Sequence, residues 1–479
     1  MTQTQHSSYL LRIKPLLTQL IDQLTKEYPF ASILASDGES KAYSVSGQGI
    51  SVSESTLLAR RGFAVRIHDG ESYSEYSFNE ITEETIPDII TRIKTLIPLK
   101  KAALNGSSPL TIHQYPIPEE APLTLDCHTE YEIAPADLSD EAILGELTDI
   151  CDRAKACDER ILDASARLTY QKYTKIYLSK NRDLIQSVLW TNGAMLVMAS
   201  RGEEIKDYYK SYSVLGGLEL LAGMKDDIKD AVNTVTGLLD AKQITPGEYD
   251  CICSPDVTGM IVHEAFGHGV EMDMFVKDRA QARQFIGEYV ASPLVTMHDG
   301  AAAAAESATY FFDDEGVPAA DTVVIDKGIL RQGICDSQAA QALGTKPTGN
   351  GRRESYERKA YTRMTNTYFE AGTDKVEDMI ASIEHGFLLE NASSGMEDPK
   401  NWGIQCMVNI AREIKDGKLT GSVYSPIVLT GYVPDLLKSI SMMSDEVKLS
   451  GGGFCGKGYK EWVKVSDGGP YMKARIRLG

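Results

Sequence analysis

The segment IVHEAFGHGVEMD, residues 261–273, carries two histidines whose spacing restricts the local fold more than any other feature of the chain. His263 and His268 are five residues apart. Five residues of a regular α-helix turn through roughly 500°, so the two imidazoles would point in directions roughly 140° apart. A single wider π-turn would return both side chains to one face, and Gly267 would lower the cost of such a distortion. We therefore predict a helix that is wound out or kinked between Glu264 and His268.

The same segment carries the residue types of a zinc hydrolase. Two histidines on one helix face can bind one ion, while a glutamate between them handles a water molecule. This pattern predicts His263 and His268 as zinc ligands and Glu264 as the catalytic carboxylate. A second interpretation is a pair of buried core histidines with Glu264 as their counter-ion.

Two histidines leave a zinc ion short of ligands, and the sequence offers two candidates for the third. Cys455 lies in the glycine-rich segment LSGGGFCGKGYKEW, residues 449–462, where a flexible backbone could deliver a thiolate. Glu271 is the rival, because it follows His268 by three residues and would share its helix face. A site with two histidines and Glu271 would favour iron and oxidative chemistry instead of hydrolysis.

Composition limits the possible partners and the compartment. A net charge of −19 and a pI near 5.0 argue against general affinity for nucleic acid or for an anionic membrane surface. Apolar runs are too short to span a bilayer, and the first residues lack the pattern of a secretory signal. The 8 scattered cysteines are typical of reduced thiols. We expect a cytoplasmic protein that binds neither DNA nor membranes.

The N-terminal half, residues 1–245, is expected to form an α+β domain with helices packed on antiparallel strands. Apolar residues recur at helical spacing in some segments and alternate with polar residues in others. The order of helix, strands and helix occurs twice, which suggests a duplicated unit. We expect helices at residues 8–28, 81–97, 139–166 and 224–239, strands within 31–78 and 169–214, and a proline-rich crossing segment at 105–137.

The C-terminal half, residues 246–479, is expected to be a mainly antiparallel β domain that carries the distorted metal-binding helix. The boundary falls in TPGEYD, residues 245–250. Cys251 and Cys253 fit an alternating strand with two buried thiols, and a role as ligands is the alternative.

Further along, hairpins are expected to turn at residues 326–328 and 416–418, and residues 374–388 are expected to form a surface helix. The acidic run Asp313–Glu315 could bind calcium or magnesium, but it lacks the spaced oxygen ligands of such sites. We expect a solvated loop, or a supporting role beside the metal.

The loop PTGNGRRESY, residues 347–356, lacks the pattern of a phosphate-binding loop. Its guanidinium groups predict recognition of an anion or carboxylate, or positioning of a substrate backbone, by Arg352 and Arg353 together with Asn366 from RMTNTY. Salt bridges that brace the loop are the alternative.

The motifs HEAFGHGVE, DDEGVP, PTGNGRRESY, RMTNTY and CGKG, taken in order, resemble the TldD/PmbA peptidase family, once called modulators of DNA gyrase. The resemblance covers roughly residues 250–460. It implies a zinc-dependent metalloprotease of the HExxxH type that cleaves unfolded or leader-type peptides from inside a dimer cavity. Carried onto this chain, His263, His268 and Cys455 would bind Zn²⁺, and Glu264 would be the catalytic carboxylate.

The resemblance also implies a role in peptide maturation or in the degradation of unstructured proteins, and a partner. The partner would be a second copy of this chain or a metal-free TldE/PmbA-like subunit of similar fold. Two other functions stay open: a non-catalytic binding or scaffold subunit braced by its metal, and the iron oxidase that Glu271 would favour.

Overall fold

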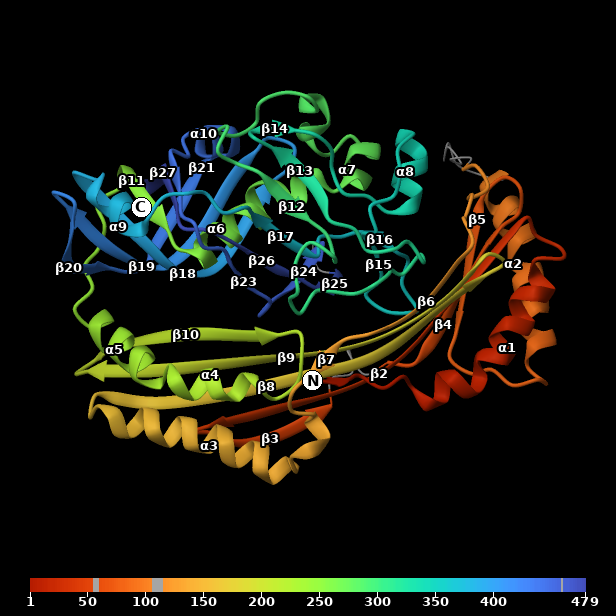
Figure 1. Cartoon of the computed structure of the whole chain (residues 1–479), viewed down its shortest axis with the longest axis horizontal. Helices are drawn as coiled ribbons and strands as arrows, with labels where there is room; N and C mark the ends of the chain where they lie inside the picture. The colour runs from red at the N-terminus through yellow and green to blue at the C-terminus, as the bar shows by residue number, and fades with distance from the viewer. Residues whose placement is uncertain (55–59, 106–114, 458–459) are drawn as a thin grey trace.

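The computed structural model describes residues 1–54, 60–105, 115–457 and 460–479, which fold into helices packed against extensive, largely antiparallel sheets (Figure 1). One eight-stranded sheet contains only strands that end before residue 215. Two further sheets, of seven and six strands, contain only strands that begin after residue 246. The predicted α+β class is confirmed.

The eight-stranded sheet has the order β10-β9-β8-β2-β4-β5, with β3 paired to β2 and β6 paired to β9. All these pairings are antiparallel except that of β6 with β9. Along its two longest strands, buried residues alternate with more exposed ones over much of the length, as expected for a sheet with one covered face. The strands are β2 (Phe30–Ser46), β3 (Gly49–Glu54), β4 (Gly62–His68), β5 (Tyr73–Phe78), β6 (Leu123–His128), β8 (Ile161–Ser179), β9 (Arg182–Arg201) and β10 (Glu204–Val214).

Helices cover the two ends of this sheet (Figure 1). At one end lie α1 (Ser8–Leu24) and α2 (Ile86–Asn105), and at the other lie α3 (Asp140–Cys157), α4 (Leu220–Asp226) and α5 (Ile228–Leu238). Each group buries its apolar face in a separate core. Ser7 caps α1 by accepting a hydrogen bond from the N–H of Leu10.

Several sequence expectations in this half differ from the structure. The helix expected at residues 81–97 spans 86–105, and the one expected at 224–239 is divided into α4 and α5. The helix expected to reach residue 166 ends at Cys157, because Asp158 accepts a hydrogen bond from the N–H of Arg160 and turns the chain into β8. The described part of the expected crossing segment, residues 115–137, contains β6, which joins the sheet because Leu123 and Leu125 pack into its core.

The seven-stranded sheet has the order β11-β18-β19-β21-β27-β22, with β20 paired to β19. Strand β11 pairs with both β18 and β27, so five strands close into a ring. Cys251 and Cys253 lie buried in β11, as the strand interpretation predicts. The strands are β11 (Gly247–Cys253), β18 (His385–Asp398), β19 (Gly403–Lys415), β20 (Lys418–Tyr424), β21 (Ile427–Tyr432), β22 (Met442–Met443) and β27 (Met472–Leu478).

The six-stranded sheet has the order β14-β13-β12-β17-β26-β23 and supports the segment that carries His263. Helix α6 (Pro255–Ile261) packs directly on β26, since a Cβ at Gly259 would lie 2.6 Å from the backbone nitrogen of Gly468. The strands are β12 (Met297–Asp299), β13 (Thr322–Asp326), β14 (Ile329–Leu330), β17 (Asn366–Phe369), β23 (Lys448–Ser450) and β26 (Ser466–Gly469).

Both expected hairpin turns are confirmed, with left-handed backbone at Lys327–Gly328 and at Asp416–Gly417. The expected surface helix is shorter than predicted. It spans only α9 (Val376–Ala381), and the chain enters β18 at His385. Among the described residues, no helix combines the length and apolarity needed to cross a bilayer.

Candidate metal centre

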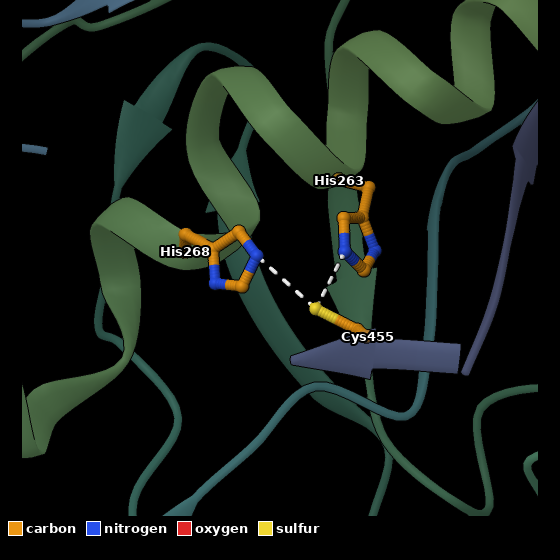
Figure 2. Close-up of side chains that lie close together, drawn as sticks. All are labelled: His263, His268 and Cys455. Carbon is orange, nitrogen blue, oxygen red and sulfur yellow. Dashed lines mark hydrogen bonds between the residues drawn. The ribbon is translucent and has the colours of Figure 1, made fainter. Parts of the chain in front are cut away.

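The chain passes from α6 into a widened helical turn that carries both histidines. Val262–Gly267 is π-helical, and the N–H of His268 donates to the carbonyl of His263, five residues earlier. A 3₁₀ turn, His268–Val270, follows. The two imidazole rings therefore lie on one side of the helix, with centroids 5.1 Å apart (Figure 2). The predicted distortion between Glu264 and His268 is confirmed.

Gly267 has a different role from the one expected. Its φ of −60° and ψ of −54° are ordinary helical values that any residue can adopt. A Cβ at this position would lie 2.2 Å from the Sδ atom of Met364. Glycine therefore leaves room for the side chain of Met364 to pack closely, and backbone freedom is not the reason for it.

Cys455 reaches the two histidines from β24 (Phe454–Lys457), far along the chain. Its Sγ atom lies 3.2 Å from Nε2 of His263 and 3.2 Å from Nε2 of His268 (Figure 2). These three donor atoms all lie within 4.8 Å of one another. Two imidazole nitrogens and one sulfur form a donor set that suits zinc and leaves a fourth position open.

Without an ion, the charges of the three residues compensate one another. Burial by itself would raise the pKa of the Cys455 thiol, but the charges of His263 and His268 and their hydrogen bonds lower this pKa well below its usual value. The pKa of His268 is raised well above its usual value, because Cys455 and Glu271 outweigh the effect of burial. These directions favour a thiolate at Cys455, the form that binds metals, paired with imidazole protons that a bound metal would displace.

Glu271 lies behind His268 and away from the thiolate. Its Oε2 atom is 3.3 Å from Nδ1 of His268 and 3.2 Å from Nζ of Lys457, while Oε1 accepts a hydrogen bond of 3.1 Å from Nε of Arg363. A carboxylate on Nδ1 fixes the ring so that Nε2 faces the ion, as is common behind metal-bound histidines. This geometry favours Cys455 over Glu271 as the third ligand.

The donor atoms open into a cavity of ≈ 1190 Å³ formed by both halves of the chain. Glu264 also lines this cavity, next to His263 on the same turn. Strand β18 runs against Glu264, because a Cβ at Gly395 would lie 2.4 Å from its Cγ atom. The opposite wall includes residues 208–211 of β10.

Two further carboxyl groups in the cavity were not found by sequence reasoning. Glu397 has no hydrogen-bond partner for either carboxyl oxygen among the described residues. Burial raises the pKa of Glu397 well above its usual value. The charge of His268 lowers this pKa, whereas Glu264 and other acidic groups raise it further. Burial also raises the pKa of Asp467 to about 6, although His263 lowers it. Neither residue belongs to a motif, so no signal in the sequence marks them.

The three residues predicted to contact substrate lie outside the lining of this cavity. Arg353 forms a 2.6 Å salt bridge with Glu75. Arg352 donates a hydrogen bond of 2.5 Å to the carbonyl of Met364. Asn366 donates from Nδ2 to backbone carbonyls, including that of Gly300 at 3.2 Å. These contacts match the alternative interpretation, in which the loop is braced internally.

The acidic run is buried, so the expectation of a solvated loop is wrong. Glu315 pairs with Arg66, and Asp314 pairs with Lys175, both from the eight-stranded sheet. The N–H donors of Glu315, Val317 and Gly351 satisfy the carboxylate of Asp313. The cations that bury this run come from distant strands, which the local sequence does not reveal. We call Arg66, Glu75, Lys175, Asp314, Glu315 and Arg353 the buried charge cluster.

The C-terminal half of the chain matches one group of known proteins, which are named as metallopeptidases. Residues 246–476 match the family model described as "PmbA/TldA metallopeptidase C-terminal domain". The "Metalloprotease TldD homolog" of Haemophilus influenzae is 35% identical over 246 residues, which are 51% of this chain and 51% of that protein. The "Metalloprotease" of Methanothermobacter thermautotrophicus is 32% identical over 283 residues, 58% of this chain and 61% of that protein. The chain spans about half the length of several curated relatives that it matches.

Solved structures extend the likeness in fold to both halves. A putative modulator of a DNA gyrase from Thermotoga maritima has a TM-score of 0.76 at 15% identity and covers 98% of this chain and 100% of that chain. TldE from Thermococcus kodakarensis has a TM-score of 0.73 at 18% identity, with 97% and 99% covered. Fold and matched region together define a protein with a PmbA/TldA-type metallopeptidase domain. The matched region places the C-terminal half of the chain, residues 246–476, in the TldD/PmbA family.

Proposed function

We propose that this chain is a zinc-dependent metalloprotease in which His263, His268 and Cys455 hold the metal and Glu264 is the catalytic carboxylate. One observation carries the proposal: two imidazole nitrogens and one thiolate converge at 3.2 Å beside a glutamate, on the wall of a large cavity. A relative from Saccharolobus solfataricus, 26% identical over 313 residues, carries the name "Zinc metalloprotease TldD homolog". That name supports zinc over iron.

Each side chain has a distinct task in this scheme. Zinc bound to this donor set would lower the pKa of a water molecule in its fourth position and polarise the scissile carbonyl. Glu264 would accept the proton of the attacking water on its carboxylate and pass it to the leaving amine. Glu271 would keep His268 in the tautomer that directs Nε2 at the ion, supported by Arg363.

We infer that the substrates are unfolded or leader-type peptides. Among the described strands, β10 pairs only with β9, and its residues 208–211 face the cavity. An extended peptide could form main-chain hydrogen bonds with such a strand edge, and a folded protein could not. The result would be peptide maturation or the degradation of unstructured chains.

We also propose that the chain works as a dimer, with a second copy of itself or with a metal-free TldE/PmbA-like subunit. The fold that it shares with TldE from Thermococcus kodakarensis supports a partner of similar shape. A cytoplasmic location stays a prediction from the sequence.

The proposal is tested by measuring metal content and peptide cleavage on the same samples. Wild-type protein is compared with His263→Ala, Cys455→Ala and Glu264→Gln, and with Cys157→Ala as the control, because Cys157 is an exposed cysteine outside the site. We expect about one zinc per chain, lost together with cleavage in the first two variants. Stoichiometric iron would support the oxidase instead, and undiminished cleavage in Glu264→Gln would support a non-catalytic subunit.

A further inference from the structure

A second convergence of histidine and carboxylate atoms lies in the N-terminal half, and it shares no residue with the metal centre. The Nε2 atom of His6 is 2.9 Å from Oδ1 of Asp126, and the Nε2 atom of His128 is 3.0 Å from the same oxygen. The two imidazole rings stack, with centroids 4.1 Å apart. One donor atom from each residue lies within 4.8 Å of the other two.

Paired backbone holds all three side chains in place. Asp126 and His128 are two residues apart on β6, so both project from the same face of that strand. His6 lies between α1 and β1 (Thr2–Gln3), which pairs with β7 (Glu130–Tyr131). The N–H of Thr4 donates to the carbonyl of Thr129, which fixes the segment that carries His6. The cluster therefore joins two parts of the chain more than 100 residues apart.

The hydrogen bond of His128 with Thr4 shows which of the two ring nitrogens carries the proton. Its Nδ1 atom lies 2.6 Å from the carbonyl oxygen of Thr4. A carbonyl only accepts, so Nδ1 carries the proton and Nε2 of the neutral ring carries a lone pair. That lone pair then faces a carboxylate oxygen at 3.0 Å. Two acceptors at this distance require a cation, either an extra proton on the ring or a metal ion.

His6 has a matching arrangement. Its Nδ1 atom lies 2.7 Å from the hydroxyl of Ser187, which also lies 2.7 Å from the hydroxyl of Thr174. Both rings of the cluster are therefore held at Nδ1 and place Nε2 beside the same oxygen of Asp126, as His268 is held at Nδ1 by Glu271. Ligands about 2.1 Å from an ion lie about 3.0 Å apart at the 90° angles of square-planar or octahedral coordination, and about 3.4 Å apart at tetrahedral angles. The observed separations fit such an ion.

His298 shows what a histidine bound only to carboxylates looks like in this protein. Its Nδ1 atom lies 2.6 Å from Asp321, and its Nε2 atom lies 2.8 Å from Glu370. Each nitrogen is taken by a different carboxylate, so no donor atoms converge on one point. The cluster around Asp126 differs because two imidazole nitrogens meet one carboxylate oxygen, and metal sites share such a meeting of donor atoms.

We propose that His6, Asp126 and His128 form a second site for a divalent transition metal such as zinc, cobalt or nickel. The ion would fasten the segment before α1 to β6. The side chain of Asp126 is 67% exposed, so water can complete the coordination sphere and the ion can exchange. Without a thiolate, this site binds more weakly than the His263–Cys455 centre and takes no part in cleavage.

Cobalt titration of chelator-treated protein tests the proposal, because only a site with a thiolate gives a sulfur-to-cobalt charge-transfer band. We expect two equivalents of Co²⁺ in the wild type, with the charge-transfer band accompanying one of them. Asp126→Asn, which changes an exposed side chain, should bind one equivalent and keep the full band. His128→Ala should do the same, and His385→Ala, at a histidine that is 52% exposed, should keep two equivalents.

The complementary variant separates this site from the proposed protease centre. Cys455→Ser should lose the charge-transfer band but retain one equivalent, and Cys455→Ser combined with Asp126→Asn should retain none. A single equivalent in the wild type, or two in Asp126→Asn, would overturn the second site and leave the protease proposal untouched.

Hydrogen exchange tests whether the ion fastens the segment. The amide of Thr4, bonded to Thr129, should exchange several-fold more slowly after the second equivalent of zinc is added to the wild type. Asp126→Asn should show no such change. Equal exchange with one and two equivalents in the wild type would overturn the fastening role.

Discussion

The metal centre and the buried charge cluster both place ionised side chains in the interior, yet they are organised differently. In the cluster, each carboxylate faces a guanidinium or ammonium group, as Glu315 faces Arg66. In the metal centre, Nε2 of both His263 and His268 lies 3.2 Å from the Sγ atom of Cys455. Burial of charge alone therefore does not mark a functional site. Convergence of several lone pairs on one point does.

The difference has an energetic basis. Opposite charges in the cluster compensate each other's loss of hydration, so the cluster can be stable without a ligand. The converging donors of the metal centre have no such compensation except through protons or a metal ion. Removing one residue should thus affect stability in the first region and ligand binding in the second.

The largest effect is expected from Cys455→Ala. Loss of the thiolate leaves two histidines for the ion, so both bound zinc and peptide cleavage should fall, cleavage by at least about 10³-fold. Zinc is measured by mass spectrometry, and unfolding by denaturant in the presence of chelator. If Cys455→Ala also lowers the free energy of unfolding in the presence of chelator, the cysteine supports the core as well as the metal. The contrast between the metal centre and the buried charge cluster would then fail.

Glu264→Gln should slow cleavage by about 10²- to 10⁴-fold, the range typical of a lost general base, while zinc stays at about one per chain. The carboxylate lies beside the metal ligands and is not one of them. Cleavage rate and zinc content are measured on the same preparation. Loss of zinc in this variant would assign Glu264 to the ligands instead.

The charge cluster is tested by Glu315→Gln, which leaves Arg66 buried with one counter-ion fewer. Its free energy of unfolding should fall by about 3–5 kcal/mol, while bound zinc per folded chain is unchanged. Denaturant titration measures the free energy of unfolding, and mass spectrometry measures the bound zinc. A matched control is Glu357→Gln, whose exposed pair with Arg60 should contribute little.

Glu75 should make the cluster sensitive to acid. Burial alone would raise its pKa, but Arg66 and Arg353 lower the pKa of Glu75 from 4.5 to about 2. Because the folded-state pKa is the lower one, its contribution is complete above about pH 4.5 and lost as the pH falls toward 2. The stability difference between wild type and Glu75→Gln should be about 3 kcal/mol at pH 7 and shrink below pH 4.5. A difference that is constant between pH 7 and pH 3.5 would contradict this cause.

The smallest effect is expected from Gly267→Ala, which probes packing beside the metal centre. The added methyl group would meet Met364, so the free energy of unfolding should fall by about 1–3 kcal/mol. Gly267→Ala combined with Met364→Ala should recover part of this loss, because the second change removes the obstructing side chain. If the double variant recovers none of the lost free energy of unfolding, backbone strain at residue 267 would explain the loss instead.

Local sequence determined the features that depend on neighbouring residues. The five-residue spacing of His263 and His268 required the π-turn, because only a wider turn places both rings on one face. The left-handed residues at 327–328 and 416–417 set the two hairpins, and alternation in β11 buried Cys251 and Cys253. The sequence also named Cys455 and Glu271 as rival ligands, but it could not choose between them.

Tertiary structure decided what depends on residues far apart in the chain. Cys455 meets His268 across 187 residues, and Arg66 buries Glu315 across 249 residues. Glu397 and Asp467 reach the cavity without any motif, and His6 meets Asp126 only because β1 pairs with β7. A spacing rule acts through the geometry of one helix or strand, whereas these contacts depend on how separate sheets pack, which no short segment encodes.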